Sequence, residues 1–443
     1  MNIQLSDHFT YRKLFRFTLP SIAMMIFTSI YSVVDGFFVS NFADKTAFAA
    51  VNFIMPFLMM LGGLGFMFGT GGSALISKTM GEGDRVSANR QFSLIVYTSI
   101  AVSAVLSLLG ILFLEPIAAL LGAEGQMLAD CVRYGRIILA ALPFFVLQME
   151  FQTFFVTAEK PQLGLISTII AGVTNMVLDA LLVGVLPLGL IGAALATAIS
   201  QTIGGIIPLV YFSRPNSSLL HLGKTNIDAS VLVRTCTNGS SELLSNISMS
   251  LVGMLYNAQL YNIAGEDGVA AYGVIMYVNF VFLAIFIGYV VGMAPVISFH
   301  FGAQNHTELK NLLKKSLVVI GSCSVCMFSL AILLARPLSL VFVSYDQALL
   351  DMTVRGFLIY SASFLFAGLA IFGSSFFTAL NNGLISAIMS FLRTMVFQVI
   401  AVLWLPVLLG GIDGIWLSIV AAEFLAATVT STFLICMRKK YSY

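Results

Sequence analysis

The amino-acid sequence predicts an all-α integral membrane protein, with twelve transmembrane helices arranged as two pseudo-symmetric lobes of six. Three observations support this prediction: the composition, the spacing of the apolar segments and an internal repeat. Of the 443 residues, 59% are hydrophobic and only 9% are charged, and the mean hydropathy is +0.97. A soluble domain carries about 25% charged residues. The chain therefore has too few charges to cover a water-facing surface, and lipid must surround most of it.

Twelve apolar segments are long enough to cross a bilayer, which takes about 20 residues. Lipid offers no hydrogen-bond partners to an open backbone, so each segment is predicted to be a helix. Their predicted bounds are 14–38, 48–76, 92–114, 136–157, 163–186, 190–212, 236–262, 269–299, 312–334, 353–379, 383–409 and 412–436.

The chain repeats itself once, at an offset of 221 residues. The stretches 76–81 and 297–302 both close a long helix, and Thr157 and Thr378 both end the fourth helix of a half. Six helices separate the copies, so both halves have the same orientation and are related by an axis along the membrane normal. The predicted parts are an N-terminal lobe (1–212), a cytoplasmic linker (213–235) and a C-terminal lobe (236–443).

The distribution of Lys and Arg predicts that both termini are cytoplasmic. With the N-terminus inside, sixteen of these residues fall in cytoplasmic segments and five fall outside. Cytoplasmic loops of membrane proteins carry such an excess. From the polar start of the chain we expect no cleavable signal peptide. Trp404 and Trp416 flank the last outer turn, where interfacial tryptophans are expected.

Four polar residues are predicted to lie at one level in the outer half of the N-terminal lobe. They are Asp35 in the first helix, Asn175 and Asp179 in the fifth, and Thr197 in the sixth. A carboxylate costs several kcal/mol in hydrocarbon, so it usually marks an ion or substrate pathway. Such oxygens suit Na⁺, and paired buried carboxylates suit a proton. The alternative is that each aspartate is a structural hydrogen-bond partner or lies close enough to the surface to be hydrated.

Other intramembrane charges have plainer interpretations. Arg393 and Glu423 lie deep in neighbouring helices, and we expect an ion pair between them. Glu150 and Glu242 lie toward the inner ends of their helices, and we expect each to have a structural role or to reach the cytoplasmic interface with its side chain.

The second helix is rich in glycine, which permits close helix packing. Pro20 and Pro295 each remove a backbone hydrogen bond and predict bends in their helices. The alternative to a role in the motion of the lobes is that these glycines and prolines serve helix packing alone. A substrate cavity between the lobes is predicted to include Met24, Met25, Tyr31, Tyr256 and Gln259.

Several classes of function are disfavoured. The net charge of +2 indicates no nucleic-acid partner, and no cofactor is predicted. None of the four histidines pairs with another at the i, i+4 spacing of a metalloenzyme helix, so an enzyme is not expected. Cys323 and Cys326 have metal-like spacing but lack a second pair. No continuous polar stripe indicates a channel.

The ordered motifs resemble the multidrug and toxic compound extrusion (MATE) family over nearly the whole chain. The resemblance lies in the stretches 19–21 and 34–36 of the first helix, 175–179 of the fifth and 192–201 of the sixth, and in 414–416 with Glu423 of the twelfth.

The resemblance implies an antiporter of a bacterial cytoplasmic membrane that expels organic, often cationic and amphipathic compounds. It also implies a proton or sodium site at Asp35, Asn175, Asp179 and Thr197. We expect small organic molecules and the bilayer as partners, and a monomer. The position 221 residues after Asp35 holds Tyr256, so we expect no second ion site in the C-terminal lobe unless Glu242 supplies its carboxylate. The remaining alternative is a lipid-linked oligosaccharide flippase of the same superfamily.

Overall fold

The computed structural model describes residues 3–42, 45–344 and 346–443, and every regular element in these ranges is a helix. The N-terminal lobe contains α1 (Tyr11–Phe42), α2 (Lys45–Gly81), α3 (Arg85–Leu120), α4 (Gly125–Ala140), α5 (Leu142–Thr157), α6 (Pro161–Asp179), the π-helical turn η1 (Ala180–Val185) and α7 (Gly189–Ser213). The C-terminal lobe contains α8 (Ala229–Gly302), α9 (His306–Val343), α10 (Gln347–Ser361), α11 (Phe364–Ala379), α12 (Gly383–Phe391), the π-helical turn η2 (Leu392–Val396), α13 (Phe397–Leu409), α14 (Ile412–Cys436) and α15 (Arg438–Tyr441).

The helices account for twelve membrane crossings. Within the described ranges, nine helices are long and apolar enough to span a membrane, and two bent pairs, α4 with α5 and α10 with α11, bring the number to eleven. Helix α8 has 74 residues, but Gly265 inside it has φ 63° and ψ −149°, which are not helical angles. An unbroken helix of that length would measure about 110 Å. The break at Gly265 therefore divides α8 into two spans, and the predicted fold class is confirmed.

The internal repeat is visible in the helix boundaries. Helices α2 and α8 end at Gly81 and Gly302, which are 221 residues apart. The bent pairs match as well, with bends of 54° between α4 and α5 and 49° between α10 and α11. The π-helical turns η1 and η2 interrupt the next span of each half. The exact boundaries of the lobes at 212 and 236 stay a prediction.

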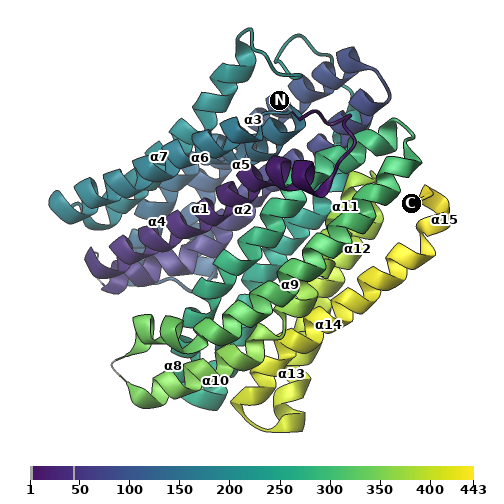
Figure 1. The fold of residues 1–443 in the computed structure, drawn as a ribbon. Helices are drawn as coiled ribbons and strands as arrows, with labels where there is room; N and C mark the ends of the chain where they lie inside the picture. Colours follow the sequence, from purple (N-terminus) through teal and green to yellow (C-terminus); the bar gives the residue numbers. More distant parts are fainter. Residues whose placement is uncertain (1–2, 43–44, 345) are drawn as a thin grey trace.

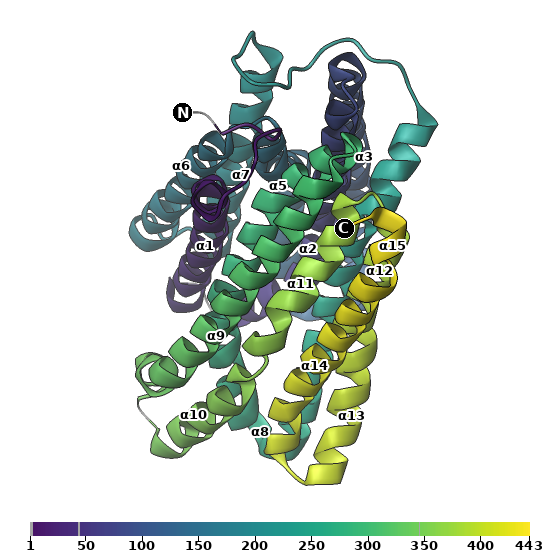
Figure 2. The same cartoon turned by 45° about the vertical axis from the view of Figure 1, so that its right-hand side comes forward.

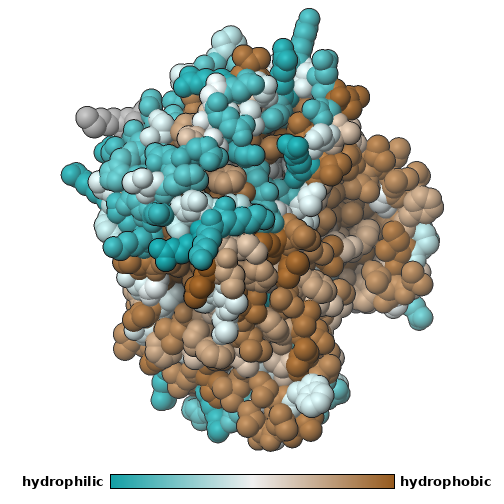
Figure 3. Space-filling view, turned by 90° about the vertical axis from the view of Figure 1, so that its right-hand side faces the viewer, coloured by the Kyte–Doolittle hydropathy of each residue, from teal (hydrophilic) through white to brown (hydrophobic). Residues whose placement is uncertain are grey.

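The surface separates into polar and apolar zones. Both termini and the segment that joins α7 to α8 lie at the same end of the molecule (Figures 1 and 2). Hydrophilic residues gather at that end, and a broad hydrophobic belt lies below them (Figure 3). Such a belt is what the hydrocarbon core of a bilayer requires. We call the end with the termini the polar end.

Backbone approaches backbone where the two lobes meet near the polar end. A Cβ atom at Gly81 would lie 2.0 Å from the carbonyl oxygen of Phe299, and one at Gly302 would lie 2.0 Å from that of Lys78. Further along α2, a Cβ at Gly63 would meet no atom closer than 3.4 Å. The lobes are therefore in direct backbone contact at the polar end, and only glycine permits this approach.

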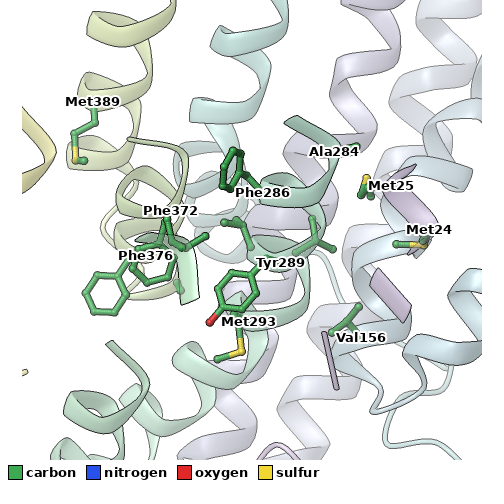
Figure 4. Close-up of a cluster of buried hydrophobic side chains, with 14 of the residues drawn as sticks. Met24, Met25, Val156, Ala284, Phe286, Tyr289, Met293, Phe372, Phe376 and Met389 are labelled. Carbon is green, nitrogen blue, oxygen red and sulfur yellow. The ribbon is translucent and has the colours of Figure 1, made fainter. Parts of the chain in front are cut away.

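One apolar cluster continues from the N-terminal lobe into the C-terminal lobe (Figure 4). It contains Met24 and Met25 of α1 together with Phe286 and Tyr289 of α8. The hydroxyl of Tyr289 is hydrogen bonded to Ser316 Oγ at 2.8 Å, so its polar atom is satisfied inside the cluster.

Of two expectations about depth, the structure narrows one and contradicts the other. Glu150 has the structural role and does not reach the cytoplasmic interface: its side chain is fully buried, and its Oε2 accepts a hydrogen bond from Ser99 Oγ. Trp416 does not lie at the outer interface either, because it is 0% exposed and stacks on Tyr272 with ring centroids 6.4 Å apart. Trp404, by contrast, is 67% exposed. Neighbouring helices cover Glu150 and Trp416. The position of a residue along its apolar segment does not predict which helices bury it.

Candidate functional site

Helix α1 presents one face to the opposite lobe. A Cβ at Gly288 of α8 would lie 2.4 Å from Ile22 Cα, and the hydroxyl of Ser29 donates to the carbonyl oxygen of Phe280 at 3.4 Å. Met25 lies between these two contacts along the same stripe and is 6% exposed. This face joins α1 to α8.

A second face of α1 points into its own lobe, toward α6. A Cβ at Gly164 would lie 3.6 Å from Met24 Sδ, and one at Gly172 would lie 2.8 Å from Tyr31 Cδ1. Asp35 follows Tyr31 by one helical turn and therefore lies on the same stripe. The spacing along α1 thus directs Asp35 toward α6. That helix carries two of the other predicted site residues, Asn175 and Asp179.

The structure brings the four predicted residues together. Thr197 Oγ1 of α7 donates to Asp35 Oδ1 at 3.4 Å. The side chains of Asn175 and Asp179 also lie within interaction range of the Asp35 carboxylate. Asn175 is 2% exposed and Asp179 is 0% exposed. Three helices that are separate in sequence therefore place two carboxylates, an amide and a hydroxyl around one point.

Several oxygen atoms at this point are free to bind something else. Both carboxylate oxygens of Asp179 and the amide oxygen of Asn175 lack a hydrogen-bond partner of normal geometry among the described residues. Buried polar atoms in native proteins are nearly always satisfied by protein, water or an ion. An array of unpaired oxygens is what a hard cation such as Na⁺ needs, and two neighbouring carboxylates can also share a proton. The geometry is compatible with either ion.

Two tyrosines complete the surroundings of the carboxylates. Tyr134 of α4 is 1% exposed and lies within electrostatic range of both Asp35 and Asp179. Tyr31 lies near Asp35 and interacts with the side chain of Gln148 of α5.

Sequence reasoning missed Tyr134 because the apolar run of the fourth segment begins only after it. In the structure, α4 already begins at Gly125, so the helical pair of α4 and α5 starts well before that run. The sequence feature that could have identified Tyr134 is its position, as a tyrosine, shortly before an apolar segment.

A cavity of about 20 Å³ lies beside Thr197 and Gln201 of α7. Its volume is sufficient for one water molecule. The other residues that line it are apolar, and Gln201 Oε1 has no hydrogen-bond partner in the described part of the chain. The two polar side chains of α7 would be the hydrogen-bonding partners of such a water.

The C-terminal lobe has a different arrangement at the corresponding place. Tyr256, which occupies the position equivalent to Asp35, is buried and donates its hydroxyl to Gln398 Oε1 at 2.6 Å. Its ring stacks on Tyr272 at 5.6 Å between centroids. This part of the lobe is aromatic rather than carboxylate-rich.

The predicted ion pair is present in the C-terminal lobe. Nε of Arg393 lies 2.9 Å and 3.1 Å from the two carboxylate oxygens of Glu423. Glu242 of α8 is partly exposed and lies within electrostatic range of Arg393. Arg393 is therefore neutralised by Glu423 and is influenced by a second carboxylate.

The five predicted cavity residues have different surroundings. Met24, Met25 and Tyr256 are buried, whereas Tyr31 and Gln259 are partly exposed. Their role in substrate binding stays a prediction. The helical assignment of α1 and α8 continues through Pro20 and Pro295, and the role of these prolines in bending also stays a prediction.

Comparisons with known proteins agree with this architecture. A family model described as MatE matches residues 20–181 and 243–404, one segment in each lobe. The chain is 26% identical to the multidrug export protein MepA of Staphylococcus aureus (strain NCTC 8325 / PS 47) over 434 residues, which cover 97% of this chain and 94% of that protein. It is also 26% identical to MepA of Staphylococcus saprophyticus over 436 residues, with the same coverage.

A solved structure described as MATE in complex with MaL6 has the same fold. Its TM-score is 0.90 at 20% sequence identity, covering 97% of this chain and 96% of that chain. The two family-model segments together span most of the chain and repeat the internal symmetry found in the helix boundaries. This chain belongs to the MatE family.

Proposed function

We propose that this protein is a secondary antiporter that exports organic, often cationic and amphipathic compounds in exchange for Na⁺ or H⁺. The observation that carries the proposal is the convergence of Asn175, Asp179 and Thr197 on the Asp35 carboxylate inside one lobe. The MepA relatives are named as multidrug export proteins, which supports organic compounds as the cargo. No specific observation favours the oligosaccharide flippase.

The coupling follows from electrostatics. When the cluster is empty, two carboxylates lie close together in a low-dielectric interior, and their repulsion is unfavourable. A bound Na⁺ or proton removes this repulsion and draws α1, α6 and α7 together. Because the other face of α1 packs on α8, a shift of α1 alters the contact between the lobes. Cation binding would thereby bias the rocking of the two lobes that exposes the cargo site to one side or the other.

The protein would work as a monomer in a bacterial cytoplasmic membrane, with both termini on the cytoplasmic side. The polar end, which holds the termini, would then face the cytoplasm. The bent helix pairs α4–α5 and α10–α11 would lie with their first halves toward the outside.

The proposal is tested with the purified chain in proteoliposomes that contain ethidium as an organic cation. We expect an imposed Na⁺ or pH gradient to drive ethidium transport, and Asp35→Asn to abolish the gradient-driven component. Asp351→Asn is the matched control, since it makes the same chemical change on an exposed turn of α10. The mechanism would be disproved if ethidium transport by the wild type depended on neither gradient. It would also be disproved if Asp35→Asn retained full gradient-driven transport.

A further inference from the structure

A pocket of about 470 Å³ opens at the polar end between the start of α3 and the segment that connects the lobes. It lies far from the carboxylate cluster and has no part in the proposed coupling. Ligand sites commonly have volumes of about 300–1,000 Å³. Its charged lining residues are Arg85 and Arg90 of α3 and Lys224 of the connecting segment. We call it the basic pocket.

Specific hydrogen bonds hold the two walls of the basic pocket together. The backbone N–H of His221 donates to Asn89 Oδ1 at 2.8 Å, and the backbone N–H of Gly223 donates to Ser93 Oγ at 3.0 Å. Asn89 and Ser93 are one helical turn apart, so the connecting segment runs along a single face of α3. The hydroxyl of Tyr97, one turn further, donates to the carbonyl oxygen of Gly223 at 3.2 Å. The pocket is therefore an ordered feature of the fold.

The described residues provide no ion-pair partner for the cations of the basic pocket. Within the described ranges, neither Arg85, Arg90 nor Lys224 has a carboxylate oxygen within 4.0 Å, since the ion pairs found there involve other residues. Two acidic residues lie within electrostatic range, Asp84 of Arg90 and Glu159 of Arg85, but beyond ion-pair distance. Each also has a hydrogen-bond partner of its own. Asp84 caps α3 by accepting from Ser87 N–H at 2.9 Å, and Glu159 accepts from Leu5 N–H at 2.6 Å. The pocket therefore has a net positive charge that attracts an anion.

The position of the pocket indicates where that anion comes from. Tyr97 lies seven residues beyond Arg90 on α3, about 10 Å along the helix axis, and is 44% exposed. From there α3 exposes large apolar side chains, among them Val105 and Leu108, which are 57% and 60% exposed. A tyrosine followed by exposed apolar residues marks the level where lipid headgroups meet acyl chains. The basic pocket therefore lies at headgroup level, directly above a surface that acyl chains can cover.

We propose that the basic pocket binds the phosphate headgroup of an anionic phospholipid from the leaflet at the polar end. Basic pockets beside transmembrane helices on the cytoplasmic side have this chemistry. The guanidinium groups of Arg85 and Arg90 and the ammonium of Lys224 supply the charge, and the exposed face of α3 receives the acyl chains. Because Lys224 belongs to the connection between the lobes, the bound lipid ties that connection to the N-terminal lobe.

The experiment compares two lipids that share acyl chains. Detergent-solubilised full-length protein is titrated with dioleoylphosphatidylglycerol or with dioleoylphosphatidylcholine, and bound lipid is counted by native mass spectrometry. We expect tight binding of the anionic lipid only. The variant Arg85→Gln/Arg90→Gln/Lys224→Gln should weaken it by about 100-fold, since each cation is expected to contribute about fivefold. The control Lys310→Gln/Lys314→Gln/Lys439→Gln removes equal charge from the polar end of the other lobe and should retain binding.

Other results would overturn the proposal. Equal binding of the two lipids by the wild type, or unchanged binding in the triple variant, excludes a headgroup site at the basic pocket. Displacement of the anionic lipid by millimolar inorganic phosphate would show that the pocket takes a soluble anion instead of a lipid. The single variant Lys224→Glu, at an exposed position, repeats the test with minimal risk to folding and should also weaken anionic-lipid binding.

Discussion

Arg393 and Glu423 form an ion pair between η2 and α14, in which Nε of the arginine lies 2.9 Å from one carboxylate oxygen and 3.1 Å from the other. The side chains are only 16% and 8% exposed. A second pair, between Arg355 and Asp413, lies at the surface of the protein, with side chains 69% and 32% exposed. The same chemistry thus occurs in the same lobe in a buried and in an exposed setting.

Breaking the buried pair should be costly because it leaves one charge without a partner. We expect Glu423→Gln to lower the free energy of unfolding by about 3–5 kcal/mol. Asp413→Asn, which breaks the exposed pair, should cost at most about 1 kcal/mol. Thermal unfolding of both variants in detergent measures the difference. Equal losses in the two variants would contradict the role of burial.

Removal of the Tyr134 hydroxyl should weaken binding of the coupling ion. The phenol lies within electrostatic range of both Asp35 and Asp179. A hydrogen bond from its hydroxyl to the charged site with the ion bound would contribute about 1.5–3 kcal/mol. In the proteoliposome assay, Tyr134→Phe should raise the half-saturating concentration of the coupling ion by about tenfold or more. Tyr97→Phe, which removes a hydroxyl at the surface, should leave that concentration unchanged. An unchanged half-saturating concentration in Tyr134→Phe would show that Tyr134 does not contribute to ion binding.

The glycines at the polar end should control how closely the lobes approach. In Gly81→Ala or Gly302→Ala, the new methyl group would lie 2.0 Å from a backbone carbonyl of the other lobe. The lobes must separate there, at a cost of about 1–3 kcal/mol. Hydrogen–deuterium exchange should become faster in residues 76–81 and 297–302. Gly321→Ala is the control, because a Cβ there meets nothing within 4 Å; equally slow exchange in all three variants would refute the prediction.

The N-terminal segment links the two lobes through two acidic residues. The backbone N–H of Leu5 donates to Glu159 Oε1 of the N-terminal lobe, and that of Phe9 donates to Glu308 Oε1 of the C-terminal lobe at 2.9 Å. Leu5 and Phe9 are both 0% exposed. Burial raises the pKa of the Glu159 carboxyl above its ordinary value, although the Leu5 N–H opposes this shift.

The raised pKa of Glu159 predicts the sign of a pH effect. The folded protein holds this proton more tightly than the unfolded chain, so the contribution of Glu159 to stability is complete below the unfolded pKa. It is lost as the pH rises through the folded pKa. Glu159→Gln keeps an oxygen that can accept from Leu5 and removes the titration. We therefore expect the variant to melt above the wild type at pH 8, with the difference shrinking toward pH 5. A gap that grows toward low pH would contradict this sign.

Much of the architecture was predictable because lipid imposes a simple rule on sequence. Each apolar run had to be a helix, so the twelve predicted segments correspond to the twelve observed crossings once α8 is divided at Gly265. The repeat was predictable because equal spacing in sequence produces equal helix lengths. The pair of Arg393 and Glu423 was predictable because two opposite charges in neighbouring apolar helices have few other ways to avoid the cost of burial.

The depth and neighbours of single side chains were less predictable. Glu150 and Trp416 lie near the ends of apolar runs, yet both are fully covered by other helices. Tyr134 lies outside the run from which its helix was predicted, yet it reaches the carboxylates because α4 extends beyond that run. Hydropathy describes how one segment interacts with lipid and carries no information on which segments surround it.

The sequence by itself determined that this chain is a membrane protein with twelve crossings and one internal repeat. It also determined that carboxylates lie within apolar segments, where their burial is unfavourable. Only the tertiary structure decided that Asp35, Asn175, Asp179 and Thr197 meet at one point, and that the three cations of the basic pocket form no ion pair with any described residue. The physical reason is that the cost of burying a group depends on its own chemistry, whereas the compensation for that cost comes from atoms supplied by distant parts of the chain.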